Sequence, residues 1–167
     1  MDKNDIRYQA YIDILKEELI PAMGCTEPIA LAYAAATARE LLGCMPERVE
    51  VGASGSIIKN VKSVIVPNTG HLKGIAAAAA AGIVAGNAGR QLEVISCVTQ
   101  EQQAQIRVFL EQVPVSVEHV DNHIIFDIIV KLYHGNESSM VRIANYHTNI
   151  VHKEKNGEVL LYLPIEE

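Results

Sequence analysis

The sequence predicts an α+β fold, in which buried, alanine-rich helices pack with a mainly antiparallel sheet formed largely by the C-terminal third. The expected helices all lie before about Gln112, and from Val113 onward the apolar residues alternate with the period of a strand. Helices followed by a run of strands are typical of α+β rather than doubly wound α/β domains. With 49% apolar and 20% charged residues, the 167 residues suit a single globular domain over 1–167.

The expected helices span 5–20, 28–42, 72–86 and the segment from the Thr99 cap to about Gln112. The first is amphipathic, and Pro21 ends it. The second and third are rich in alanine and apolar all round, which indicates buried helices, and their small residues permit close helix contact. Gly43 is a suitable stop for the second. In the fourth, Thr99 and Gln102 have the spacing of a capping box.

The expected strands span 48–53, 94–98, 113–120, 124–134, 139–149 and 159–163. Residues 57–66 fit either a helical turn or a further short strand, and 67–70 form a strong turn signal. The pairs Gly135-Asn136 and Asn156-Gly157 are typical of hairpin turns.

Composition excludes several classes of function. The net charge of −6 and the aromatic content of 5% argue against a nucleic-acid partner. The start of the chain has no signal-peptide pattern, and the apolar run over 75–85 is too short to span a bilayer, so we expect a cytoplasmic protein without a membrane partner. Three widely spaced cysteines, without a CxxC pair, suggest neither a disulfide framework nor a self-contained zinc site.

The segment Gly24-Cys25-Thr26-Glu27-Pro28 places a cysteine at the start of the second expected helix. Unpaired backbone N–H groups and the helix dipole favour an anion there, which lowers the pKa of a thiol. Such a thiolate can act as a nucleophile, a redox group or a metal ligand, whereas a small buried residue is the plain structural alternative. Cys44 and Cys97 look structural.

Two loops of small residues, 54–56 and 68–74, precede helical segments. Their backbone N–H groups can hold a carboxylate or a phosphate, and Lys59 and Lys73 could add positive charge. Ordinary turn and capping chemistry explains the same spacing. Neither loop matches the P-loop or the dinucleotide fingerprint, so nucleotide binding is rejected.

Residues 18–28 resemble the N-terminal signature of the L-cysteine desulfidase family, which is related to the iron–sulfur L-serine dehydratase α chain. Residues 58–60, 66–70 and 73–74 are similar to a second motif of that family, and 147–150 with 155–158 are similar to a third. The resemblance covers almost the whole chain in order, and its first motif is the specific one.

The resemblance implies a lyase of amino-acid catabolism that eliminates L-cysteine to pyruvate, ammonia and sulfide. A [4Fe–4S] cluster held by three cysteines would leave one iron open as a Lewis acid. Cys25 would be one cluster ligand. The substrate pocket would be lined by Thr26, Lys59, Asn60, Asn68, Thr69, Gly70 and Lys73. The sequence does not identify the catalytic base.

The chain departs from this family in length, because members carry the other two cluster cysteines in a later C-terminal half. Cys44 and Cys97 match neither of these two cluster cysteines. We therefore expect the N-terminal part of such an enzyme, which by itself binds no cluster and lacks desulfidase activity. It would need the missing half or a partner chain, and its uncovered apolar surface could drive homo-oligomerisation. The alternatives are a dehydratase of L-serine or another small amino acid, and a non-catalytic assembly or binding module.

Overall fold

The structure is a computed structural model, and it describes residues 26–61, 66, 69, 72–89, 94–95, 98–120, 126–144 and 149–163. The helices in this part are α2 (Thr26–Leu42), α3 (Gly55–Val61), α4 (Gly74–Ala85) and α5 (Gln100–Gln112). The strands are β1 (Arg48–Ala53), β2 (Val115–His119), β3 (Asp127–His134), β4 (Glu137–Ala144), β5 (Ile150–Lys155) and β6 (Glu158–Tyr162). The helix predicted over 5–20 lies outside the described residues.

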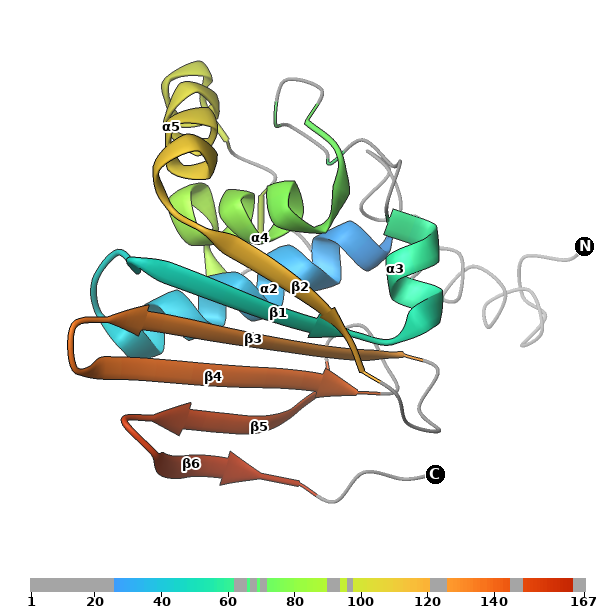
Figure 1. The fold of residues 1–167 in the computed structure, drawn as a ribbon, viewed down its shortest axis with the longest axis vertical. Helices are drawn as coiled ribbons and strands as arrows, with labels where there is room; N and C mark the ends of the chain where they lie inside the picture. The colour runs from blue at the N-terminus through green and yellow to red at the C-terminus, as the bar shows by residue number, and fades with distance from the viewer. Residues whose placement is uncertain are drawn as a thin grey trace, which may run out of the picture.

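The six strands form one sheet in the order β2-β1-β3-β4-β5-β6. Every neighbouring pair is antiparallel except β1 and β2, which run parallel. The helices stack above this sheet in layers, with α2 against β3, β4 and β5, α4 on α2, and α5 on α4 (Figure 1). The predicted α+β class is therefore confirmed, and the sheet is mainly antiparallel.

The helix α4 is apolar all round because it is enclosed on several sides. It contacts α2, α3 and α5, and its residues from Ala77 to Ile83 are buried. Gly82 lies opposite Ala32 of α2, and Gly86 lies opposite Ala36, where an added Cβ would come within 2.9 Å of the Ala36 Cβ. Both pairs advance by four residues in the same direction, so α2 and α4 run parallel, with their backbones in close contact.

One face of the sheet buries branched side chains under α2 and α4. Val49 and Val51 of β1 alternate with exposed or half-exposed neighbours, as predicted, and Ile128, Val130 and Leu132 do the same on β3. Two polar side chains also connect the sheet to α2. The hydroxyl of Ser139 donates to the carbonyl of Ala38 at 2.7 Å, and Lys155 Nζ donates to the carbonyl of Leu42 at 2.7 Å.

Several local predictions are confirmed. The N–H of Gly43 donates to the carbonyl of Arg39, and Gly43 adopts a φ of +82°, which ends α2 in the left-handed conformation. The Thr99 hydroxyl accepts from the N–H of Gln102, whose side chain accepts from the N–H of Thr99, so the capping box opens α5. Asn156 and Gly157 both have positive φ, as a type I′ hairpin requires.

The strand predicted over 94–98 is not found at the described residues of that range, which are 94, 95 and 98. Val94 and Ile95 form a turn, and the carbonyl of Val94 accepts from the N–H of Asn87 at 2.9 Å. Both side chains are buried, so the apolar run reflects core packing rather than sheet pairing. The ambiguous segment begins as helix, since α3 extends to Val61. The strand β5 was not predicted, because its sequence carries polar residues at four successive positions.

Candidate functional site

The first turns of α2 and α4 lie at the same end of the molecule, because the two helices run parallel. Figure 1 shows α3 at this end, and α3 contacts both helices. The segments that carry Thr26, Lys59, Asn60 and Lys73 therefore come together, although they lie far apart in the sequence. Thr26 is the first residue of α2 and directly follows Cys25 in the sequence.

The electrostatics of this end suit an anionic group. The N-terminus of a helix carries partial positive charge, and here two such ends are side by side. Lys73 occupies the N-cap position of α4 without a side-chain cap, so no side chain at that position satisfies the first N–H groups of the helix. Lys59 and Lys73 are both exposed, which leaves their charges at the surface beside these helix starts.

Thr69 is fully buried, and its hydroxyl closes the loop before α4. It donates to the carbonyl of Val66 at 2.7 Å and accepts from the N–H of Leu72 at 3.2 Å. The N–H of Val66 donates in turn to the carbonyl of Leu72 at 2.8 Å. These bonds give Thr69 a clear structural role, and its contact with a substrate stays a prediction.

The structure describes the remaining predicted site residues only in part. Cys25, Asn68 and Gly70 lie outside the described residues. Thr26 and Asn60 are placed as parts of α2 and α3, and their side chains are not described. Their predicted roles remain predictions.

The described residues do not provide a ligand set for a [4Fe–4S] cluster. Within this part of the chain, no group of three or more His, Cys, Asp or Glu side chains could hold a metal ion. Cys44 follows the C-terminal end of α2, whose 17 residues span about 25 Å at about 1.5 Å per residue. A thiolate beside Thr26 and the Cys44 thiol therefore cannot share one cluster. The third cysteine, Cys97, lies outside the described residues.

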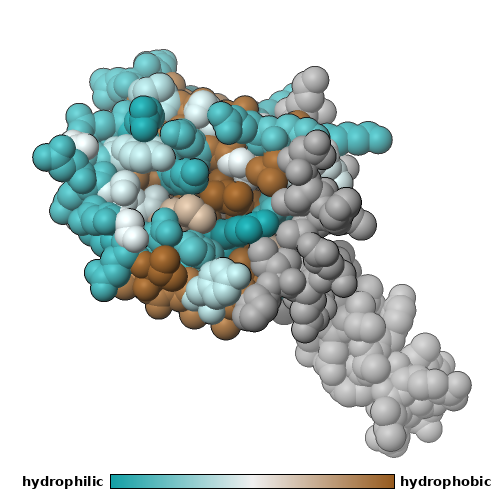
Figure 2. All heavy atoms as spheres, turned by 60° about the horizontal axis from the view of Figure 1, so that its bottom comes forward, coloured by the Kyte–Doolittle hydropathy of each residue, from teal (hydrophilic) through white to brown (hydrophobic). Residues whose placement is uncertain are grey.

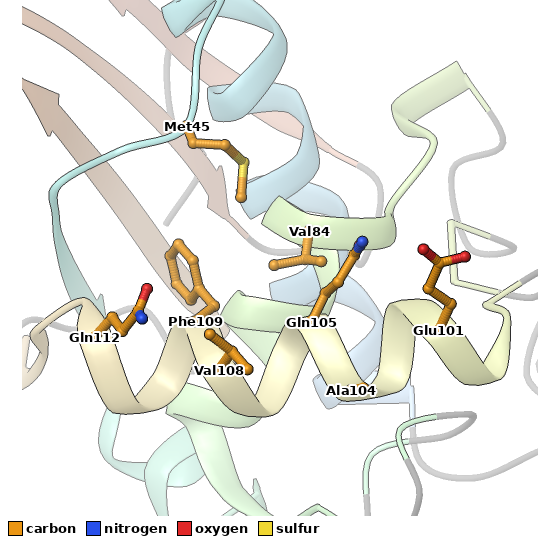
Figure 3. Close-up of a pocket in the computed structure, with 8 residues that line it drawn as sticks. All are labelled: Met45, Val84, Glu101, Ala104, Gln105, Val108, Phe109 and Gln112. Atoms are coloured by element: carbon orange, nitrogen blue, oxygen red, sulfur yellow. The ribbon is translucent and has the colours of Figure 1, made fainter.

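A groove of about 600 Å³ lies at the opposite end of these helices, between α5 and the ends of α2 and α4. Met45, Val84, Val108 and Phe109 line it, and Figure 3 shows the side chains of Met45, Val84 and Phe109 converging between the elements. The sequence gives no separate signal for it, since Val108 belongs to the apolar run that continues with Phe109 and Leu110. Its lining offers few groups for catalysis.

A polar cluster on the sheet face away from α2 was missed by sequence reasoning. Arg142 of β4 donates to both carboxylate oxygens of the buried Asp127, at 2.9 and 2.7 Å. This hydrogen bonding raises the pKa of the Arg142 guanidinium above its ordinary value, and burial opposes it. His152 is the cross-strand neighbour of Arg142. Its ring packs edge-on against the ring of Tyr162, with 6.0 Å between the two ring centroids.

The cluster continues to Glu154, whose carboxylate lies 3.1 Å from His152 Nε2 but is not aligned for a hydrogen bond. The sequence could not indicate this arrangement, because Arg142, His152 and Tyr162 come together only through the pairing of β5 with β4 and β6. The buried Asp127–Arg142 pair reads as structural, since each group satisfies the other.

The chain is similar to UPF0597 proteins. It is 54% identical over 160 residues to one from Desulfitobacterium hafniense, a match that covers 96% of this chain and 37% of the relative. A relative from Lachnoclostridium phytofermentans is 45% identical over 160 residues, with 96% and 38% covered. One from Treponema denticola is 40% identical over 164 residues, with 98% and 38% covered. The chain thus spans little more than a third of the length of these relatives.

No family model matches the chain. No solved structure matches it either. The names of the relatives state no activity, substrate or cofactor. In the described part of the chain, no helix combines the length and the apolar character needed to cross a membrane.

Proposed function

We propose that this chain forms the N-terminal, substrate-proximal part of an iron–sulfur lyase of the L-cysteine desulfidase type. The observation that supports the proposal is the parallel packing of α2 and α4 through the Ala32–Gly82 and Ala36–Gly86 pairs. This register brings the helix start after Cys25 to the same end as the helix start after Lys73. Two motifs on which the family resemblance rests therefore become neighbours.

In this proposal, the carboxylate of a small amino acid binds at the start of α4. The uncapped N–H groups of the first turn donate hydrogen bonds to it, and the charges of Lys59 and Lys73 add attraction. Cys25 provides one thiolate of the cluster. The remaining thiolates come from outside the described residues, because Cys44 lies at the far end of α2. The isolated chain is accordingly not expected to turn over substrate.

A chimera tests this proposal with the chain's own residues. In it, this chain replaces the matching segment of the longer D. hafniense relative, and the protein is purified and reconstituted without oxygen. We expect visible cluster absorption and the release of pyruvate and sulfide from L-cysteine. Cys25→Ala should abolish both, and Cys44→Ala should leave both intact. A Cys25→Ala chimera that retains the absorption and sulfide release would overturn the assignment.

The lysine roles have a separate readout. Lys73→Met should raise the KM for the amino acid while the cluster absorption stays unchanged, because the lysine acts on the carboxylate. Lys131→Met is the matched control, since Lys131 is an exposed lysine on the sheet. An unchanged KM in the Lys73→Met chimera would remove Lys73 from the site.

The same geometry suits L-serine, because the proposed contacts engage only the carboxylate. Pyruvate release from L-serine, compared with pyruvate and sulfide release from L-cysteine, decides between the two leaving groups. A chimera that binds the cluster and turns over neither substrate would favour a non-catalytic assembly module.

A further inference from the structure

The strand β6 carries a sequence that does not match its place in the sheet. Residues 159–163 are five consecutive apolar residues, a pattern typical of strands covered on both faces. Yet Val159 and Leu160 are each 51% exposed, Tyr162 is 70% exposed and Leu163 is 42% exposed. Because side chains alternate along a strand, these residues leave both faces of β6 uncovered.

The position of β6 explains this exposure. It is the last strand of the sheet order and pairs with β5 alone among the described strands. The helix α2 lies over β3, β4 and β5, and the Lys155–Leu42 hydrogen bond joins β5 to the end of that helix. Figure 2 turns the β6 side toward the viewer and shows hydrophobic patches within a largely hydrophilic surface.

The opposite edge of the sheet, β2, is more polar than β6. On β2, polar residues alternate with valines at Ser116, Glu118 and His119, and Pro114 precedes the strand. Charged residues and proline at an edge oppose the addition of further strands. Each edge strand has one charged residue, Glu118 on β2 and Glu158 on β6, and Pro164 lies two residues after β6, but the four residues of β6 after Glu158 are apolar. The two edges therefore differ in polarity, because β2 has three polar residues among its five and β6 has one.

We propose that β6 is an internal strand of a larger sheet in the assembled protein. Its occupant is an extended apolar segment from the part of the longer protein that the relatives have and this chain does not match. The relatives provide such a part, because the match covers only 37% of the D. hafniense protein. Main-chain hydrogen bonds to the edge of β6 that no described strand occupies supply affinity, and the side chains of Leu160 and Tyr162 supply the apolar contact. This inference does not depend on the lyase chemistry.

Hydrogen exchange tests the pairing directly. We expect the β6 amides to exchange at least about tenfold more slowly in the chimera than in the isolated chain, because an added strand protects them. The β2 amides serve as the internal control and should exchange alike in both. Equal exchange of β6 in both proteins would overturn the proposal. If the chimera does not fold, the matching segment of the unmodified D. hafniense relative gives the same comparison.

A substitution provides the second measurement. Leu160→Lys should leave the Tm of the isolated chain nearly unchanged, since Leu160 is half exposed there, and should lower the Tm of the chimera, where the lysine would be buried. Val108→Lys is the matched control, because Val108 is 47% exposed on α5. If instead the isolated chain dimerises and Leu160→Lys makes it monomeric while β6 is unprotected in the chimera, a second copy is the occupant and the proposal is wrong.

Discussion

The backbone of Ala32 occupies the space that a side chain at Gly82 would need. A Cβ added to Gly82 would overlap the Ala32 carbonyl group, which belongs to the neighbouring helix and cannot move independently of it. The two helices can therefore approach this closely only because Gly82 of α4 has no side chain. This contact fixes the separation of the two helices and, with Gly86 and Ala36, their relative direction.

Gly82→Ala should destabilise the fold by about 3 kcal/mol, because overpacking between two backbones cannot relax through a side-chain rotation. Denaturant unfolding followed by circular dichroism measures the change. Gly89→Ala is the control, since its nearest contact would be the flexible Asn87 side chain at 3.3 Å. Equal stability of the two variants would show that α2 and α4 are not in backbone contact.

Thr69→Val should cost about 1–3 kcal/mol, because it removes the hydroxyl that the Val66 carbonyl and the Leu72 N–H use as a buried partner. Thr69→Ser keeps the hydroxyl and should retain most of the stability. Thermal unfolding of the two variants separates the effects. If both variants are equally stable, the hydroxyl does not hold the loop together.

Arg142→Met should destabilise the fold by about 3 kcal/mol, because it leaves the buried Asp127 carboxylate without its guanidinium partner. The double variant Asp127→Asn/Arg142→Met should recover part of the loss, since no charge is left without its partner. Arg48→Met is the control: that guanidinium is exposed over the Tyr133 ring and should contribute less than about 1 kcal/mol. A double variant less stable than Arg142→Met would contradict this account.

Burial raises the pKa of the Tyr33 hydroxyl above its ordinary value of 10.0, and the negative charge of Glu40 adds to the effect. The unfolded chain therefore loses this proton at lower pH than the folded chain does. The contribution to stability is complete below about pH 10 and is lost as the pH rises through the folded pKa.

Tyr33→Phe should accordingly flatten the decline of the unfolding free energy as the pH rises above about 10. Denaturant unfolding at several pH values measures this slope. Tyr162→Phe is the control, because Tyr162 is largely exposed, and it should follow the original chain. A Tyr33→Phe slope identical to that of the original chain would exclude this contribution.

The local elements with their own chemical signals could be predicted from the sequence. Thr99 and Gln102 specify the start of α5, Gly43 ends α2, and the alternation around Val49 and Val51 marks β1. These signals act between near neighbours, so the fold as a whole is not needed to read them. The strand predicted at Val94 and Ile95 failed because this signal is not specific. A segment buried in the core and a strand buried in a sheet give the same apolar run.

The candidate site could be predicted less well from the sequence, because its geometry depends on contacts between residues that are distant in the sequence. The small residues of α4 indicated close packing, whereas the direction of the packing follows only from the pairing of Gly82 with Ala32 and Gly86 with Ala36. The Asp127–Arg142 pair likewise requires β3 and β4 to be aligned. The chemical roles of Cys25 and Lys73 rest on family resemblance and remain predictions.

The place of β1 between β2 and β3 has a consequence for synthesis on the ribosome. Its partners, β2 and β3, lie at 115–119 and 127–134, far behind it in the order of translation. Until these strands emerge, the apolar side chains of β1 and the alanine-rich surfaces of α2 and α4 have no sheet to cover them. We expect the nascent chain to engage chaperones during this interval, since such non-local pairing forms slowly and exposes apolar surface meanwhile.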